Sequence, residues 1–176
     1  TGQHKVVLDV PEIDSALGVW RASIWVRQYT DALGVAPKDS TSVLVLRHHA
    51  IALAMQQKYW DDYAIGKTMK ATHPITEKIT DRNPALLTSS RPADELPGQF
   101  DDLALTKFID RGGIALGCAL AFDTCIQTIM KKDKITEDAA HKKALSLLVP
   151  GIILQPSGIF AVIRAQEAGC AYVRAS

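Results

Sequence analysis

The sequence has neither the excess of charge nor the long apolar runs that mark nucleic-acid-binding and membrane proteins. Its formal net charge is +1, and lysine and arginine never stand more than two in a row. A basic surface for nucleic acid is therefore not predicted. The apolar stretches are far shorter than the roughly 20 residues that cross a bilayer as a helix. We expect a protein that binds no nucleic acid and does not insert into a membrane.

Cysteine is also scarce. The chain of 176 residues has three, Cys118, Cys125 and Cys170, which is too few and an odd number for a disulfide framework. No C-x-x-C pair occurs, which argues against a thioredoxin-type dithiol and a cysteine-rich zinc site. The motifs G-x-G-x-x-G, the P-loop, G-x-S-x-G and H-E-x-x-H are missing as well. Dinucleotide-binding, nucleotide-binding, hydrolase and zinc-protease functions thus lose their main support.

Short apolar runs of strand length alternate with helical stripes along the whole chain. Strands are expected at residues 5–10, 42–46, 114–120, 151–155 and 170–173. Amphipathic helices are expected between them, with the first ending at Gly34 and another beginning at Thr136. Such alternation implies right-handed crossovers and a sheet covered on both faces. We predict one α/β domain over residues 1–176, with a five-stranded, mostly parallel, doubly wound sheet of the flavodoxin-like type.

One long connection interrupts this alternation. Between about residues 68 and 98 the chain contains Pro74, Pro84, Pro92 and Pro97, with serine, threonine and aspartate between them. Loops of this length without regular structure are usually functional loops, lids or oligomer arms. We treat the segment as a proline-broken insertion in the domain.

Cys118 lies in an apolar run that Gly112-Gly113 opens and Asp123-Thr124 closes. The carboxyl ends of parallel strands are where open α/β sheets place ligands and chemistry. A reactive cysteine acts as the thiolate, which a helix N-terminus or a nearby cation favours, and the next helix is expected to start near Asp123. The alternative is an inert cysteine that packs as a small apolar residue. The residues alone leave both interpretations open.

Arg47, His48 and His49 follow the second predicted strand. Neighbouring residues of a strand point to opposite faces, so one histidine is expected to line the crevice and the other to pack away. Two adjacent histidines are therefore poorly spaced for one metal ion. Histidine can act as an acid or base, bind metal or complete a polar network. The other three histidines are expected at the surface: His4, His73 and His141.

Aromatic and charged residues meet at the end of the second predicted helix, from Ala50 to about Tyr63. Tyr59 and Trp60 are the candidates for a ligand platform or an interface anchor, because their rings combine an apolar body with a polar tip. The alternative is an ordinary helix stripe that faces the core.

Several of these segments together resemble the DsrE/DsrF-like (TusD-related) sulfur-relay family. The similar segments are residues 46–50, 59–63, 114–120, 149–158 and 165–173. The segment Ile114-Ala115-Leu116-Gly117-Cys118-Ala119-Leu120 is similar to the family's cysteine strand, and the last two segments are similar to its final β-α-β unit. The first two resemble a branch whose members often carry export signals. The resemblance covers nearly the whole chain outside the insertion.

The resemblance implies a homo-oligomer, commonly a trimer or hexamer, with clefts between subunits. It implies that Cys118 lies where relay members carry a persulfide, and that the chain meets a sulfur-donor or sulfur-acceptor protein without needing a metal or nucleotide. It also implies a bacterial protein in the periplasm after removal of an export signal. The start at Thr1 rather than methionine agrees with that expectation; the alternative is a cytoplasmic protein.

Two hypotheses from different functional classes follow. The first is a sulfur carrier or sulfurtransferase-type protein in which Cys118 takes the sulfur and Arg47 or His48 stabilises the thiolate or persulfide. It needs no cofactor. The second is a non-catalytic binding protein that holds a small ligand, haem or metal at a subunit-interface crevice. His48 or His49 would bind it, together with Tyr59, Trp60 and Cys118. Whether the protein is an enzyme stays open at this point.

Overall fold

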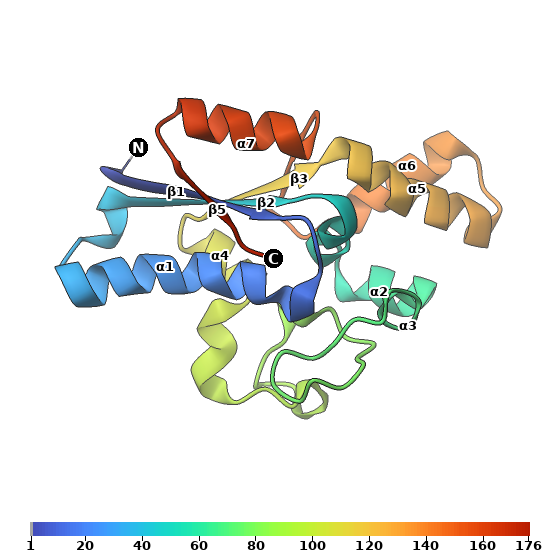
Figure 1. Ribbon diagram of the computed structural model, residues 1–176. Helices are drawn as coiled ribbons and strands as arrows, with labels where there is room; N and C mark the ends of the chain where they lie inside the picture. Colours follow the sequence, from blue (N-terminus) through green and yellow to red (C-terminus); the bar gives the residue numbers. More distant parts are fainter. Residues whose placement is uncertain (1) are drawn as a thin grey trace.

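The computed structural model describes residues 2–176 and has a parallel β-sheet at its centre (Figure 1). The strands are β1 (His4–Val10), β2 (Ser40–Leu46), β3 (Ile114–Cys118), β4 (Ile153–Gln155) and β5 (Ala171–Arg174). Their order in the sheet is β4-β3-β2-β1-β5, and every neighbouring pair is parallel. The predicted α/β class with a five-stranded, flavodoxin-like sheet is confirmed.

The two longest strands form the middle of the sheet. β1 and β2 pair over their full length, from His4 opposite Ser40 to Val10 opposite Leu46. The last five residues of each strand are buried on both faces. This explains their continuous apolar sequences, which are typical of parallel strands covered by helices on both sides. The edge strands β4 and β5 are shorter; β5 is exposed throughout, whereas β4 is exposed at Ile153 and half-buried at its other two residues.

Helices cover the two faces of the sheet unequally. The helices are α1 (Leu17–Leu33), α2 (Gln57–Tyr63), α3 (Ile65–Met69), α4 (Leu105–Asp110), α5 (Ala119–Asp133), α6 (Glu137–Ser146) and α7 (Gly158–Glu167). α7 lies on one face of the sheet, and α1 and α4 lie on the other, while α5 and α6 pack together beyond the sheet (Figure 1). Within residues 2–176, no helix combines the length and the apolar character needed to cross a membrane.

The predicted helix ends at Gly34 and Thr136 are confirmed. Gly34 follows the last residue of α1, and its N–H donates to the carbonyl oxygen of Thr30 at 3.0 Å. Its φ of +66° is a left-handed conformation that glycine adopts without strain. At the start of α6, the Thr136 hydroxyl accepts from the N–H of Ala139 at 3.4 Å. Both ends follow the local residue pattern, so the sequence was sufficient to find them.

The predicted continuous helix over residues 50–63 is wrong. The chain instead forms a 3₁₀ helix at His48–Ala54 before α2 begins. The buried side chain of Asn83 donates to the carbonyl oxygens of Leu53 at 3.1 Å and Met55 at 2.7 Å. The hydrogen bonds of these two carbonyls thus come from a side chain at least 28 residues away in the sequence. The local residue pattern gives no sign of this interaction.

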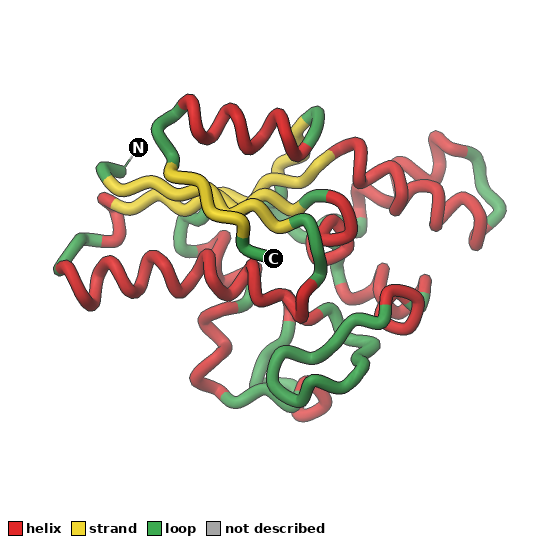
Figure 2. The backbone as a smooth tube through the Cα atoms, viewed as in Figure 1, coloured by secondary structure: helices red, strands yellow, loops and turns green. Residues whose placement is uncertain are grey.

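The segment from 68 to 98 is irregular but closely packed, and it runs beneath α1 in the view of Figure 2. His73, predicted at the surface, is instead buried. Its Nε2 lies 2.8 Å from the carbonyl oxygen of Asp94, and its Nδ1 accepts from the N–H groups of Ile75 and Thr76 at 3.1 Å each. The ring thus organises the backbone around it, which accounts for its burial.

The predicted surface position is correct for His141 but not for His4. His141 is exposed on α6, as predicted. His4 is half-buried, with its ring centroid 5.1 Å from that of Tyr29 on α1.

Candidate functional site

The candidate site lies at the carboxyl edge of the sheet. Because the strands are parallel, β1, β2 and β3 all end at this edge, at Val10, Leu46 and Cys118. Leu46 pairs with Gly117, so Arg47 and Cys118 follow at the same level on neighbouring strands. The ends of these two strands are therefore neighbours in the sheet, as a role of Arg47 beside Cys118 requires.

A cavity of about 730 Å³ opens at this edge. Among the residues predicted for the site, its lining includes Arg47, His48, His49, Tyr59 and Cys118. Trp60 does not line this cavity. It is 1% exposed, and its indole N–H donates to the carbonyl of Ala52 at 2.8 Å inside the core.

Cys118 is the last residue of β3 and also the N-cap of α5. Its Sγ accepts a hydrogen bond from the N–H of Ala121 at 3.4 Å. The helix starts at Ala119, earlier than the expected position near Asp123. Its buried stripe begins with Phe122 and continues at helical spacing, so the apolar run belongs partly to a strand and partly to a helix. The thiol therefore lies directly at the N-terminus of a 15-residue helix.

Arg47 is held by a carboxylate in the sheet. Its Nε and Nη2 donate to the two oxygens of Asp9 at 2.7 and 2.9 Å, and the Tyr172 hydroxyl donates to the same carboxylate at 2.9 Å. Asp9 is 3% exposed. The hydrogen bonds to Asp9 raise the pKa of Arg47, and the nearby Cys118 adds to this rise. Arg47 is therefore a fixed cation at the wall of the cavity.

Asp9 was not predicted as a site residue. The available signal was an acidic residue inside an otherwise apolar strand, Val6-Val7-Leu8-Asp9-Val10, because a buried charge needs a partner.

The alkyl chain of Arg47 also packs against Gly158 at the start of α7. A Cβ at Gly158 would lie 2.5 Å from the Cβ of Arg47, so this position has no room for a side chain.

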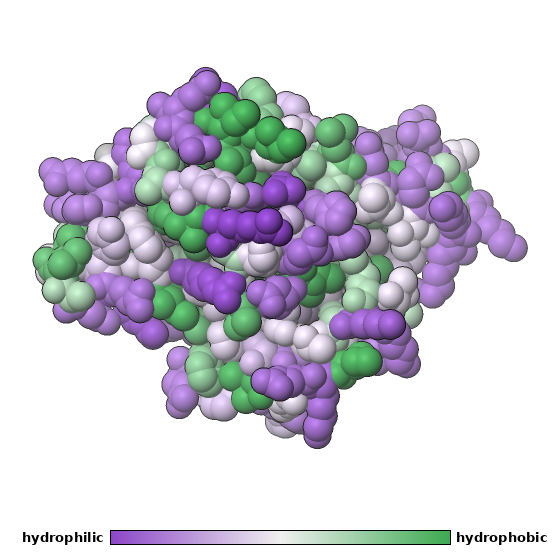
Figure 3. Space-filling model, in the orientation of Figure 1, coloured by the Kyte–Doolittle hydropathy of each residue, from purple (hydrophilic) through white to green (hydrophobic). Residues whose placement is uncertain are grey.

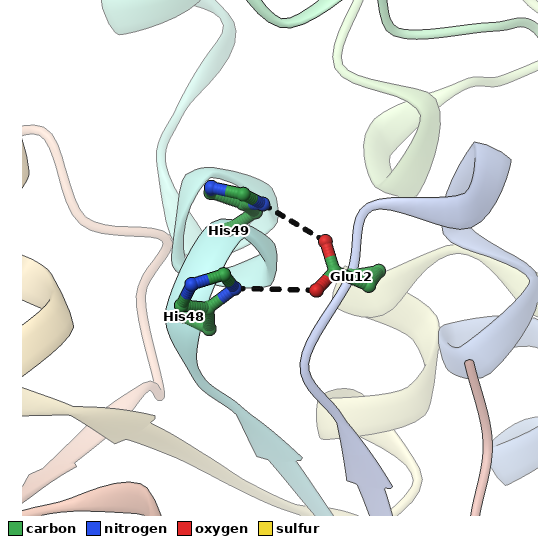
Figure 4. Close-up of side chains that lie close together, drawn as sticks. All are labelled: Glu12, His48 and His49. Carbon is green, nitrogen blue, oxygen red and sulfur yellow. Dashed lines mark hydrogen bonds and ion pairs between the residues drawn. The ribbon is translucent and has the colours of Figure 1, made fainter.

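His48 and His49 lie side by side rather than on opposite faces. Strand β2 ends at Leu46, and His48 has φ +51°, so the alternation expected for an extended chain does not apply. The two ring centroids are 3.9 Å apart. The Nδ1 atoms of His48 and His49 lie 3.2 and 2.9 Å from the two carboxylate oxygens of Glu12 (Figure 4).

Glu12 was not predicted as a site residue. It follows the end of β1 by two positions, so the rule that led to Arg47 and Cys118 could have found it. The hydrogen bond with His49 is the main cause that lowers the pKa of Glu12 below its usual value. The carboxylate is therefore ionised at neutral pH.

All three cysteines are buried, with Cys118, Cys125 and Cys170 7%, 2% and 8% exposed, and Cys125 lines the same cavity as Cys118. Cys125 is on the buried face of α5, and burial raises its pKa to about 11. Cys170 is also buried, and burial raises its pKa as well. Burial likewise raises the pKa of Tyr59. The thiols of Cys125 and Cys170 and this phenol are therefore uncharged at neutral pH.

The cavity thus combines a thiol at a helix N-terminus, a fixed guanidinium group and two imidazoles that share one carboxylate. Such a set can support nucleophilic chemistry at sulfur and can also bind a ligand or an ion. No family model matches the sequence, and a search of curated proteins finds no match either.

Proposed function

We propose that the protein is a sulfur carrier of the DsrE/DsrF-like type, with Cys118 as the persulfide site. The observation that carries this proposal is the position of the Cys118 Sγ, which caps α5 and lines the cavity beside Arg47. A helix N-terminus and a nearby cation both favour the thiolate, which is the nucleophile. The resemblance of residues 114–120 to the family's cysteine strand gives independent support, and resemblance to the exported branch supports a periplasmic location.

The transfer that we propose is a thiolate–persulfide exchange. The Cys118 thiolate attacks the outer sulfur of a donor persulfide, R–S–SH, and a new S–S bond forms. The S–S bond of the donor breaks, and R–S⁻ leaves with the electron pair. Cys118–S–SH remains, and no external oxidant or reductant is needed. The same exchange with an acceptor thiolate releases the sulfur again, so the partners are a sulfur-donor and a sulfur-acceptor protein.

Arg47 is the favoured partner of the negatively charged sulfur. Its bidentate bond to Asp9 fixes the guanidinium at the cavity wall, and its positive charge does not depend on pH in the physiological range. His48 is less suited to this role, because its Nδ1 is already engaged by Glu12.

Incubation with a small-molecule persulfide is expected to add one sulfur atom to each chain, at Cys118. Intact-mass spectrometry of the folded protein measures the gain, and peptide mapping locates it. Brief exposure to iodoacetamide at pH 8 should alkylate Cys118 and spare Cys125, because a thiol with a pKa of about 11 is almost entirely protonated at that pH.

Cys118→Ser and Cys125→Ser form the matched pair for this experiment. The first substitution should abolish the sulfur adduct, and the second should leave it unchanged. If Cys118 of the folded wild-type protein resists both the persulfide and iodoacetamide, or if the adduct persists in Cys118→Ser, sulfur transfer at this residue is contradicted.

An exposed apolar surface supports the second element of the proposal, a homo-oligomer, either a trimer or a hexamer. Figure 3 shows apolar side chains over α7, where Ile159, Phe160 and Ile163 are 66%, 44% and 49% exposed. Leu120 at the start of α5 is 67% exposed, and both Leu120 and Ile159 line the cavity. A second copy that covers this surface would also close the cavity beside Cys118.

Introducing charge into this surface should dissociate the oligomer. We expect the wild-type protein to sediment as a trimer or hexamer in analytical ultracentrifugation, and the double variant Ile159→Glu/Ile163→Glu to sediment as a monomer. Leu33→Glu is the control, because Leu33 is equally exposed, at 66%, but lies at the far end of α1. A monomeric wild-type protein would contradict this element of the proposal.

A further inference from the structure

Glu12, His48 and His49 form a cluster that sulfur transfer at Cys118 does not require. The three side chains come from the segments that directly follow the neighbouring strands β1 and β2, and they converge on one point (Figure 4). We propose that this cluster is a binding site for one divalent transition-metal ion of the zinc type. The proposal goes beyond the persulfide function, because its ligands do not include Cys118.

The spacing of the ligand atoms fits a single ion. One atom from each residue lies within 4.8 Å of the other two, and the two nitrogen–oxygen distances are 3.2 and 2.9 Å. Ligands bonded to zinc at about 2.0–2.2 Å in tetrahedral geometry stand roughly 3.2–3.6 Å from one another. An ion would replace the two hydrogen bonds, which run to different oxygens of Glu12. The three side chains are about half exposed, so they have room to bring their ligand atoms to this spacing.

The backbone at His48 holds the imidazoles in this arrangement. A non-glycine residue with positive φ is uncommon, and His48 has φ +51°. In an extended chain, His48 and His49 would point apart. The left-handed turn instead brings their ring centroids to 3.9 Å and directs both Nδ1 atoms toward Glu12. Adjacent histidines, which are poorly spaced on a strand, become a suitable pair of ligands here.

The donor set favours one class of ion. Two imidazoles and one carboxylate suit Zn²⁺, Co²⁺, Ni²⁺ and Cu²⁺, whereas Mg²⁺ and Ca²⁺ prefer sites made of oxygen atoms. A haem bound by both histidines would need their rings on opposite sides of the macrocycle, so their close approach favours a bare ion. The side chains of His48 and His49 are 57% and 56% exposed, which leaves at least one coordination position open to solvent or the cavity.

Metal titration of the purified, EDTA-treated protein tests the proposal. Calorimetry with Zn²⁺ should give one ion per chain for the wild type. Glu12→Gln and His49→Gln should each weaken binding at least about tenfold, the scale on which loss of supporting groups affects metal sites. Both residues are exposed or half-buried, so the variants should still fold, which circular dichroism checks. Addition of Co²⁺ should produce visible d–d bands without thiolate charge-transfer bands.

Two control variants separate this site from other zinc-binding groups. His141→Gln removes an exposed histidine on α6, and Cys118→Ser removes the thiol of the cavity. Both should bind Zn²⁺ as the wild type does. The proposal is overturned if the wild type binds no Zn²⁺, if Glu12→Gln and His49→Gln bind it normally, or if Cys118→Ser alone loses it. The persulfide test measures the mass of Cys118 and the metal test measures the zinc bound per chain, so failure of either proposal is recognised without the other.

Discussion

Replacement of Arg47 by alanine is expected to lower the free energy of unfolding by about 3–5 kcal/mol. Arg47 provides two hydrogen bonds to Asp9, whose side chain is 4% exposed within the sheet. Without the guanidinium, one carboxylate oxygen keeps the Tyr172 hydroxyl, and the charge loses its only described cationic partner among residues 2–176. Most of the loss thus comes from a buried charge left without its counter-ion, rather than from the attraction between the two groups.

Urea denaturation followed by circular dichroism measures this change. Arg164→Ala is the control, because Arg164 pairs with Glu167 on the surface and its side chain is 65% exposed. Loss of such a pair costs roughly 0–1 kcal/mol. The double variant Asp9→Asn/Arg47→Ala should regain part of the stability, since it removes the unpaired charge. If Arg47→Ala is as stable as Arg164→Ala, the ion pair does not stabilise the fold.

The sheet could be predicted because the information for it is local. The continuous apolar sequence of β2, for example, reflects burial on both faces, and the helix ends at Gly34 and Thr136 depend on residues within a few positions. The position of Cys118 at the carboxyl end of a strand also followed from this pattern. The exact start of α5 did not, because leucine, alanine and phenylalanine suit an apolar strand as well as a buried helix face.

The partners within the site could not be predicted with the same rules. Asp9 and Arg47 are 38 residues apart, and Glu12 and His49 are 37 apart. The two pairs form only because β1 and β2 lie next to each other in register, which is a property of the finished sheet. The positive φ of His48 is likewise set by its surroundings, and the residues next to it in the sequence do not predict it. Side-chain chemistry identified candidates, and strand order decided which of them meet.

The insertion gives a second example of long-range organisation. Its prolines predicted an irregular segment, but not the burial of its centre. Leu87 and Leu96 are buried with Trp20 of α1 in a small apolar cluster, and the ring of Phe100 stacks on Trp20 at 5.1 Å. The segment is therefore packed against the domain rather than free to swing as a lid, and its polar core should contribute to the stability of the whole fold.

Replacement of Asp94 by alanine is expected to cost about 3 kcal/mol of unfolding free energy. Asp94 is fully buried. One oxygen accepts from Arg82 Nε at 2.8 Å, and the other accepts from the N–H of Thr88 at 3.1 Å. Alanine would leave a mostly buried guanidinium, 22% exposed, and a backbone N–H without these bonds. The turn that presents the Asp94 carbonyl to His73 would lose its anchor at the same time.

The position of the urea midpoint shows how far this effect reaches. Because the insertion is packed against α1, Asp94→Ala should shift the single global transition of the domain to lower urea concentration without changing its slope. Asp102→Ala is the matched control, since Asp102 pairs with Arg111 at the surface and its side chain is 71% exposed. That variant should unfold within about 1 kcal/mol of the wild type. A wild-type midpoint in Asp94→Ala, with faster proteolysis confined to residues 68–98, would show instead that the insertion unfolds independently of the sheet and that its polar core does not support the domain.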